Sequence, residues 1–172
     1  MKKYAFTTAV IILLSATGCY SPISGRVIDA ETNQPIEGAV VLVEWTKTIG
    51  YGLTYTESYK VAEALSGKDG QLELPGCNSA FVNAPDVTVY KKGYVAWSSR
   101  WMFPGYRNRT DFRWGDYVFK LDRFKEGYSY IDHTSFIHSS INLGFGDKKL
   151  IAESYYWEEL EASKERDNRR SH

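Results

Sequence analysis

Residues 51–65 alternate between large and small side chains, and this pattern constrains the fold of the chain more than any other. Odd positions hold Tyr51, Leu53, Tyr55, Tyr59, Val61 and Leu65, while most even positions are small or polar. The tyrosines also recur every fourth residue, as they would on one face of a helix. The intervening Gly52, Thr54 and Thr56 are poor helix formers, however, and threonine favours strands. The pattern therefore predicts a strand with one buried face.

Similar alternation recurs along the chain and is interrupted at short intervals by residues that favour turns. The further predicted strands are residues 23–29, 38–45, 71–75, 86–92, 94–98 and 117–121. Polar stretches at 30–35 and 68–70 are suited to turns. Several short strands joined in this way predict a mainly β protein, an antiparallel sandwich. The predicted core positions are Val27, Val41, Val43, Leu72, Leu74, Val87 and Val89.

After residue 122 the apolar period changes from two to that of a helix. Phe136, Ile137, Ser140 and Ile141 have helical spacing within 130–143, and Asp147 is suited to cap a second helix. The predicted apolar stripe of that second helix is Leu150, Ser154, Trp157 and Leu160, with Glu158 on a solvated face. Residues 123–172 are too few for a core of their own. We therefore expect this helical extension to pack on the sandwich.

Four short motifs stand out within the predicted sandwich: residues 23–30 (ISGRVIDA), 34–41 (QPIEGAVV), 68–70 (KDG) and 92–94 (KGY). Together they resemble the carboxypeptidase regulatory-like domain. The resemblance implies a transthyretin-like Greek-key sandwich of about seven strands over residues 19–122, with no active-site residues. The segment between Trp45 and Lys68 is longer than the family pattern, which predicts extended strands or a protruding hairpin.

The first 19 residues combine a basic start, a short apolar run and small residues before a cysteine. Lys2 and Lys3 precede the apolar run, and residues 16–19 read Ala-Thr-Gly-Cys, which resembles the lipobox of a bacterial lipoprotein signal. The apolar run is too short to span a membrane. The resemblance implies that residues 1–18 are removed, that Cys19 carries lipid, and that the protein is sorted to the outer membrane. An ordinary secretory peptide with a chance cysteine, or a buried N-terminal strand, is the alternative.

Charge and cysteine content exclude some functions and limit others. Without residues 1–18, which hold Lys2 and Lys3, the chain has 19 basic side chains against 21 acidic ones. That balance gives no electrostatic basis for binding nucleic acid. If Cys19 carries lipid, Cys77 has no partner within the chain. We expect a buried, inert thiol there, and an intermolecular disulfide or a metal thiolate is the alternative.

Aromatic and cationic side chains interleave between residues 97 and 119. The residues of this segment that are candidates for binding a ligand are Trp97, Arg100, Trp101, Tyr106, Arg107, Arg109 and Trp114. Aromatic stacking and forked guanidinium contacts suit sugars or phosphate groups. In the alternative interpretation, Trp97, Tyr117 and Phe119 belong to the core and the arginines cover aromatic edges.

Motifs of catalysis or metal binding are absent from the sequence. It has no nucleophile elbow, zinc-protease helix or phosphate-binding loop. His133 and His138 lie five residues apart, on different helix faces, whereas ligand pairs on a helix prefer a spacing of four. We expect no catalytic residue, metal or cofactor. The leading hypothesis is a non-catalytic envelope lipoprotein used for binding or structural support, with a protein partner. The alternatives are envelope-glycan binding through the aromatic and arginine segment, and an unrecognised enzyme.

Overall fold

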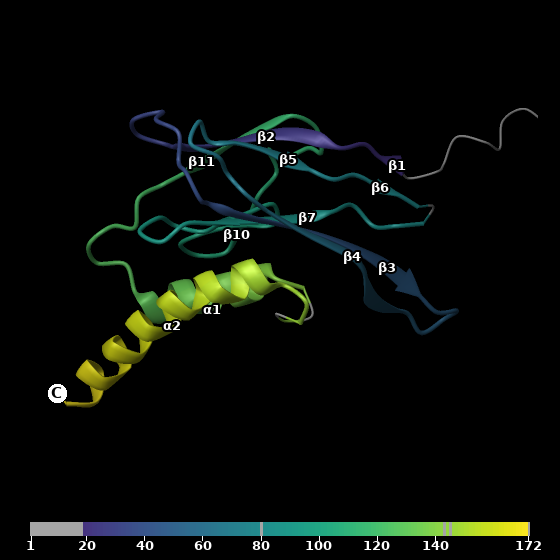
Figure 1. Cartoon of the computed structure of the whole chain (residues 1–172). Helices are drawn as coiled ribbons and strands as arrows, with labels where there is room; N and C mark the ends of the chain where they lie inside the picture. The colour runs from purple at the N-terminus through teal and green to yellow at the C-terminus, as the bar shows by residue number, and fades with distance from the viewer. Residues whose placement is uncertain (1–18, 80, 143, 145, 172) are drawn as a thin grey trace, which may run out of the picture.

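The computed structural model describes residues 19–79, 81–142, 144 and 146–171, so the predicted signal peptide at 1–18 lies outside it. The architecture has three layers (Figure 1). A three-stranded sheet faces a four-stranded sheet, and two C-terminal helices cover the outer face of the four-stranded sheet. The predicted class, a mainly β sandwich with helices packed on it, is confirmed.

The strands follow the predicted alternation with shifted ends. The three-stranded sheet has the order β11-β2-β5, formed by Tyr117–Leu121, Ile23–Asp29 and Gln71–Leu74. The four-stranded sheet has the order β4-β3-β7-β8, formed by Tyr55–Leu65, Val40–Ile49, Asp86–Tyr90 and Trp97–Ser98. Two small sheets pair β1 (Cys19–Tyr20) with β6 (Cys77–Asn78), and β9 (Trp101–Met102) with β10 (Arg107–Asn108).

One strand pair departs from the predicted antiparallel arrangement. Strand β11 runs parallel to β2, with Tyr117 opposite Gly25 and Leu121 opposite Asp29. A parallel pair cannot be joined by a tight turn and needs a long connection. Strand β2 ends at Asp29 and β11 begins at Tyr117, so the chain between them is long enough for this connection. Alternation within a strand carries no information about the direction of its neighbour.

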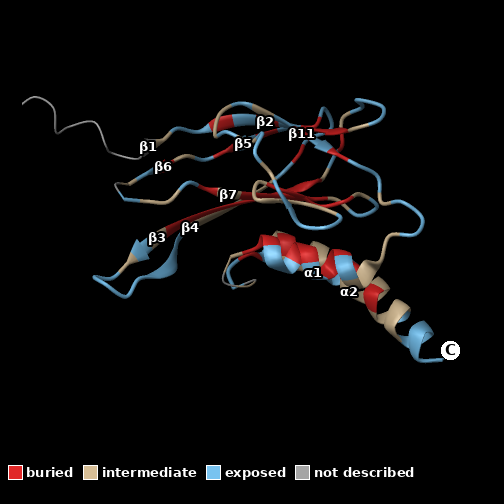
Figure 2. Cartoon of the chain, turned by 180° about the vertical axis from the view of Figure 1, so that it is seen from behind, coloured by how far each residue is buried: buried red, intermediate tan, exposed pale blue. Residues whose placement is uncertain are grey.

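The four-stranded sheet is buried on both faces, which explains its run of consecutive apolar residues. Val41 and Val43 point into the core between the two sheets, whereas Val40 and Leu42 point towards the helices. Figure 2 shows the resulting buried layers in red. All the predicted core positions are buried: Val27, Val41, Val43, Leu72, Leu74, Val87 and Val89.

The predicted buried face of residues 51–65 is wrong. Strand β4 begins at Tyr55, and the exposed fractions of Tyr51, Leu53 and Tyr55 are 108%, 93% and 59%. The cause is the length of the β3–β4 hairpin, because β7 pairs only with Val40–Glu44 of β3. The rest of the hairpin extends beyond the sandwich as a two-stranded arm, in agreement with the predicted protruding hairpin.

Helices α1 (Tyr130–Ser140) and α2 (Lys149–Arg170) form the third layer. Helix α1 buries Phe136 and Ile137 as predicted. The predicted stripe of α2 is displaced, because the buried residues are Ile151, Glu158 and Ala162, and Trp157 is exposed. The displacement arises because Glu158 forms buried hydrogen bonds, so a charged residue lies on the inner face.

A glutamate from another element binds the N-terminus of each helix, and Ser129 also caps α1 locally. Glu165 of α2 accepts hydrogen bonds from Ser129 Oγ and from the backbone N–H of Tyr130 at the start of α1. Glu63 of β4 accepts from the N–H groups of Leu150 and Ile151 at the start of α2. Carboxylates stabilise helix N-termini through free N–H groups and the helix dipole. The predicted cap Asp147 is wrong, because the N-cap position is Lys148 and Glu63 takes over its role.

Candidate functional site

Trp97, the first candidate residue, lies in the core between the sheets. It is 5% exposed, and its ring contacts Phe112, Tyr117 and Phe119 with ring centroids 5.0–5.5 Å apart. Aromatic rings at such separations in edge-on geometry stabilise a core beyond the burial of their area. Trp97 therefore serves packing.

Arg109 covers the Trp97 ring, with its guanidinium carbon 4.5 Å from the ring centroid. Its Nε donates to the carbonyl of Ser98 at 2.7 Å, and its Nη1 lies 3.3 Å from Asp111. This arrangement matches the alternative interpretation of the segment, in which arginines cover aromatic edges. A sugar ring has no access to this face of Trp97.

The remaining candidates lie in different places. Arg100 pairs with Asp86 at 3.5 Å and donates to the Ser139 carbonyl of α1 at 3.0 Å, so it ties the sheet to the helix. Trp101 is half-buried against the helix-facing core. Two of the seven candidates therefore contact the helical layer.

Tyr106 and Trp114 lie in separate surroundings. Tyr106 is 41% exposed, and its ring lies 5.5 Å from that of Phe136. Trp114 donates from Nε1 to the Ser21 carbonyl at 2.9 Å and contacts the rings of Tyr20 and Trp45. Trp114 thus ties the start of the described chain to the sandwich.

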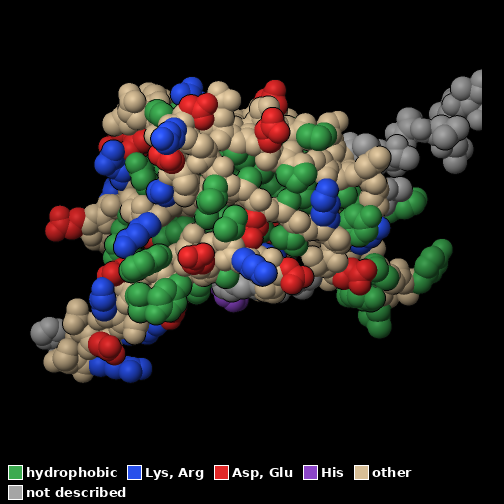
Figure 3. Space-filling model, viewed as in Figure 1, with side chains coloured by type: hydrophobic (Ala, Val, Ile, Leu, Met, Phe, Trp, Pro, Cys, Tyr) green, Lys and Arg blue, Asp and Glu red, His purple; other side chains and the backbone are tan. Residues whose placement is uncertain are grey.

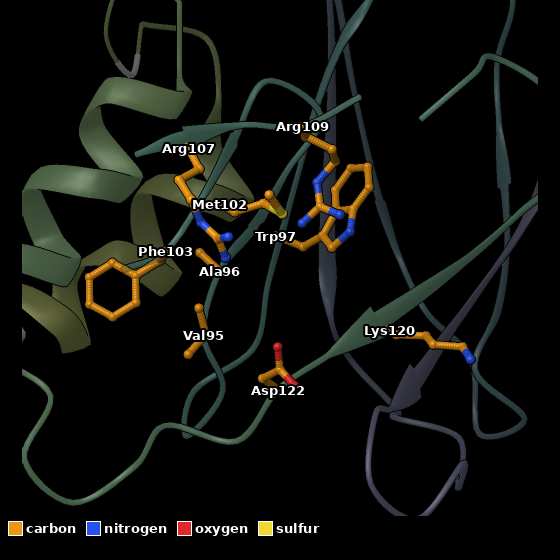
Figure 4. Close-up of a pocket in the computed structure, with 9 residues that line it drawn as sticks. All are labelled: Val95, Ala96, Trp97, Met102, Phe103, Arg107, Arg109, Lys120 and Asp122. Atoms are coloured by element: carbon orange, nitrogen blue, oxygen red, sulfur yellow. The ribbon is translucent and has the colours of Figure 1, made fainter. Parts of the chain in front are cut away.

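One small hollow brings three of the seven candidates together (Figure 4). Its volume is about 140 Å³, and it is lined by Val95, Ala96, Trp97, Met102, Phe103, Arg107, Arg109, Lys120 and Asp122. The guanidinium groups of Arg107 and Arg109 and the carboxylate of Asp122 point towards the same space, whereas the Lys120 ammonium points away. A hollow of this size and charge suits a small anionic group more than a sugar ring.

His133 is buried in a polar network that joins α1, α2 and the sheet. Its Nε2 accepts from the backbone N–H of Ala96 at 2.9 Å, so its Nδ1 carries the proton and donates to Glu158 at 3.2 Å. The Tyr90 hydroxyl donates to the other Glu158 oxygen at 2.7 Å, and burial followed by the Glu158 charge raises the pKa of Tyr90. Both ring nitrogens of His133 are therefore engaged, which leaves neither free for a metal or a proton transfer.

A second buried network, which the sequence did not reveal, holds the loop between the helices. Glu44 and Lys148 are 2% and 4% exposed, and Lys148 Nζ lies 2.6 Å from Glu44 Oε1. The N–H of Asn142 donates to the other Glu44 oxygen at 3.0 Å, and Asn142 Nδ2 donates to Asp86 at 2.7 Å. Burial raises the pKa of Glu44, although Lys148 and Asn142 favour its charged form. The periodic patterns of the sequence do not show that these polar side chains meet in the interior.

Asp29 organises the turn after β2. It accepts hydrogen bonds from the N–H groups of Thr32 and Glu31 at 2.9 Å and from the Tyr94 hydroxyl at 3.1 Å, and it pairs with Arg123 at 2.8 Å. The hydrogen bond from Thr32, with smaller contributions from Glu31 and Tyr94, lowers the pKa of Asp29 to about 2. The carboxylate holds the turn and the start of the helical extension to the sandwich.

The lowered pKa of Asp29 predicts a loss of stability in acid. An aspartate whose pKa is lower in the folded state stabilises the fold above its unfolded pKa of about 3.9, and that stabilisation is lost as pH falls through the folded value. The wild type should therefore lose more stability between about pH 4 and pH 2 than Asp29→Asn does. Urea unfolding across that range measures the difference, and Asp122→Asn, at an exposed carboxylate, is the control. Parallel pH profiles for wild type and Asp29→Asn would contradict the assignment.

Cys77 is 1% exposed in the core, as expected for an inert thiol. A side chain buried this deeply cannot reach a partner chain while the core is closed. Within the described residues, no group of three or more His, Cys, Asp or Glu side chains could hold a metal ion. Over the same residues, neither helix is long and apolar enough to cross a lipid bilayer.

Comparison with known proteins identifies no family. No protein-family model matches the chain, and no curated protein matches it. Similar solved structures include a streptococcal ancillary pilin, at 16% identity and a TM-score of 0.33, over 63% of this chain and 30% of the pilin. The backbone protein of group B streptococcus pilus 2b has 14% identity and a TM-score of 0.33, over 62% of this chain and 42% of that one.

A third similar structure is the C-terminal domain of the shaft pilin SpaA from Lactobacillus rhamnosus GG. It has 17% identity and a TM-score of 0.31, and the match covers 62% of this chain and 98% of that domain. This chain spans less than half the length of the ancillary pilin and the pilus backbone protein. At these TM-scores, nothing about function follows from the likeness.

Proposed function

We propose that this chain is a non-catalytic lipoprotein of the bacterial outer membrane, anchored through lipid on Cys19, whose sandwich serves binding or structural support. One observation supports the proposal that the protein is not a catalyst: its reactive side chains are bound to other groups of the protein. His133 and Glu158 satisfy each other in the interior, and Arg109 covers Trp97. A general acid or base must reach its substrate. His133 and Glu158 face the protein interior instead.

The anchor is supported by the sequence before Cys19, and the structure around Cys19 defines what an anchor there would do. The backbone of Cys19 pairs with Asn78, and that of Tyr20 with Cys77. The lipid-bearing residue would thus belong to the sandwich and not to a long tether. Even if the few residues between Cys19 and Ile23 were fully extended, the domain would lie within roughly 15 Å of the bilayer. This favours a partner in the same membrane or at its surface.

One observation favours ligand binding as a second function. Arg107 is exposed and points, with Arg109, into the hollow of Figure 4. We propose that envelope glycans bearing an anionic group are the ligands that this arrangement would take. Calorimetric titration with phosphorylated and neutral envelope glycans tests the idea on wild type and Arg107→Ala. Equal heats for both proteins would refute it.

Membrane fractionation tests the proposed anchor. Cys19→Ser should move most of the protein from washed membranes to the soluble fraction, because one acyl chain or none gives only reversible binding, whereas two or more chains hold a protein stably. Cys77→Ala is the matched control, since it removes the other cysteine and should leave the protein in the membranes. Retention of Cys19→Ser in carbonate-washed membranes would contradict lipid anchoring at this residue.

A further inference from the structure

The β3–β4 hairpin carries apolar side chains at its tip, in contrast to the turns at 30–35 and 68–70. Its two strands pair from Val40 with Leu65 as far as Ile49 with Tyr55, and the turn lies between Ile49 and Tyr55. The turn at 30–35 and the turn at 68–70 hold mostly polar or charged residues. Those turns follow the general rule for exposed loops. The apolar tip of the hairpin therefore calls for a separate explanation.

The tip side chains are unusually open. Tyr51 is 108% exposed and Leu53 is 93% exposed, and Tyr55 follows at 59%. Beyond Trp45 the arm extends for about 14 Å, at about 3.4 Å per residue, before it reaches Ile49. Exposed apolar side chains gathered at the end of a projecting element mark an interaction site. In Figure 3, hydrophobic side chains gather at this end of the molecule.

Hydrogen bonds and strand pairing place the arm at the same end of the sandwich as Cys19. The backbone of Cys19 pairs with Asn78, and the chain then passes Phe81, which is 86% exposed. Asn83 Nδ2 donates to Thr46 Oγ1 at 2.9 Å and to Thr48 Oγ1 at 3.2 Å on the arm. Figure 1 shows β1 and the hairpin tip at the same end of the sandwich. Cys19, Phe81 and the tip therefore share one end of the molecule.

We propose that the hairpin tip, formed by Tyr51, Leu53 and Tyr55, inserts into the interface of the lipid bilayer that holds the anchor. This inference rests on the proposed lipid at Cys19, because that lipid brings the same end of the sandwich to the membrane. Tyrosine places its ring at the level of the headgroups, and leucine adds apolar burial below them. With the lipid, the tip makes a second contact that fixes the orientation of the sandwich.

The charges of the arm fit a bilayer better than a second copy of the chain. Lys47 lies with its Nζ 3.7 Å from the Tyr59 ring centroid, so a cation stands behind the aromatic tip, where anionic headgroups would meet it. Strand β4 is the edge of its sheet, and its part within the arm carries the exposed Glu57. Charged residues on an edge strand oppose pairing with another edge. A pairing of two hairpins is therefore disfavoured.

Fluorescence quenching in vesicles tests the insertion. A polarity-sensitive dye is attached to Leu53→Cys in the lipidated full chain, and to Lys68→Cys as the matched control. Lys68 follows the end of β4 that pairs with Val40, away from the tip. The unsubstituted chain, whose Cys77 is buried, serves as the labelling blank. The vesicles contain phosphatidylethanolamine and phosphatidylglycerol, with and without lipids that carry a shallow spin label.

We expect the dye at position 53 to shift to shorter wavelength and to be quenched by the spin-labelled lipids, and the dye at 68 to do neither. Equal quenching at both positions, or none at 53 in protein that floats with the vesicles, would overturn the insertion and leave the anchor intact. If the lipidated chain does not float with vesicles, the proposed anchor fails.

A second experiment tests insertion without the anchor. The Cys19→Ser chain, which cannot carry the lipid, is mixed with excess vesicles, and its partitioning into them is measured. In that background, Leu53→Ser should weaken partitioning into the vesicles by about tenfold, the effect of one buried leucine side chain. Lys68→Ser is the control and should leave partitioning nearly unchanged. The same partition coefficient with and without Leu53→Ser, together with an unquenched dye at 53, would overturn the inference whatever the state of Cys19.

Discussion

Replacing Lys148 with methionine is expected to lower the free energy of unfolding by about 3–5 kcal/mol, because it leaves the buried carboxylate of Glu44 without its cation. The Nζ of Lys148 lies 2.6 Å from Glu44 Oε1, and both side chains are almost completely buried. Urea unfolding at neutral pH measures the loss. Lys149→Met is the matched control, because the neighbouring lysine is exposed and its replacement should change stability little.

The loss in Lys148→Met should depend on pH. Burial already raises the pKa of Glu44 in the folded protein, and removal of the ammonium raises that pKa further. A carboxyl whose folded pKa lies above its unfolded value costs no stability below the unfolded value, about 4.3, and destabilises as pH rises through the folded value. The deficit of Lys148→Met should therefore shrink as pH falls towards about 4. A deficit that is constant from neutral pH to pH 4 would show that the ion pair is not its source.

Phe119→Ala is expected to cost about 3–5 kcal/mol, the usual range for a fully buried phenylalanine. Phe119 is 0% exposed in β11, and its ring centroid lies 5.0 Å from that of Trp97. Its ring also contacts Gly25 of β2, where an added Cβ would lie only 3.0 Å from Phe119 Cε2. The truncation leaves a cavity at the point where the parallel strands and the aromatic core meet.

Val118→Ala is the control for Phe119→Ala. Val118 precedes Phe119 on the same strand but points outwards, with 47% of its side chain exposed. Chemical denaturation of the two variants should give a large loss for Phe119→Ala and less than about 1 kcal/mol for Val118→Ala. A larger loss for Val118→Ala than for Phe119→Ala would mean that β11 is shifted in register by one residue, since such a shift exchanges the buried and exposed faces.

The sequence predicted the sandwich well where one face of a strand is apolar and the other polar. Leu72 and Leu74 alternate with polar neighbours and are buried as expected. The same reasoning was wrong for Tyr51 and Leu53, because alternation reports which residues share a face and not whether anything covers that face. Only the pairing of β7 with a short part of β3 shows that the hairpin leaves the sandwich.

The helical layer shows a second limit of pattern reading. Glu158 looks like a solvated residue in the sequence, yet Tyr90 and His133 satisfy it in the interior. Glu63 and Glu165 bind the N-termini of helices that are distant from them in the sequence. No local sequence motif predicts these two contacts. Hydrogen bonds between residues distant in sequence determine where these glutamates lie. A periodic pattern in the sequence does not show which residues form such bonds.

The candidate site was predicted only in part. Trp97 and Arg109 do lie together, but in a core contact and not as an open platform for a ligand. Arg100 and Trp114 lie apart from them, each bound to a different part of the chain. Residues close in sequence separate here because β8, β9 and β10 are short and the chain turns between them.

The central claim is that Cys19 is the lipid-bearing first residue of the mature protein. Mass spectrometry of the intact protein, extracted from membranes by detergent, tests it most directly. We predict a chain that begins at Cys19 and whose mass exceeds that of its polypeptide by a diacylglyceryl group and an N-acyl chain, with both groups on the N-terminal peptide. A membrane-derived protein with an unmodified Cys19, or with an N-terminus at another residue, would contradict the account.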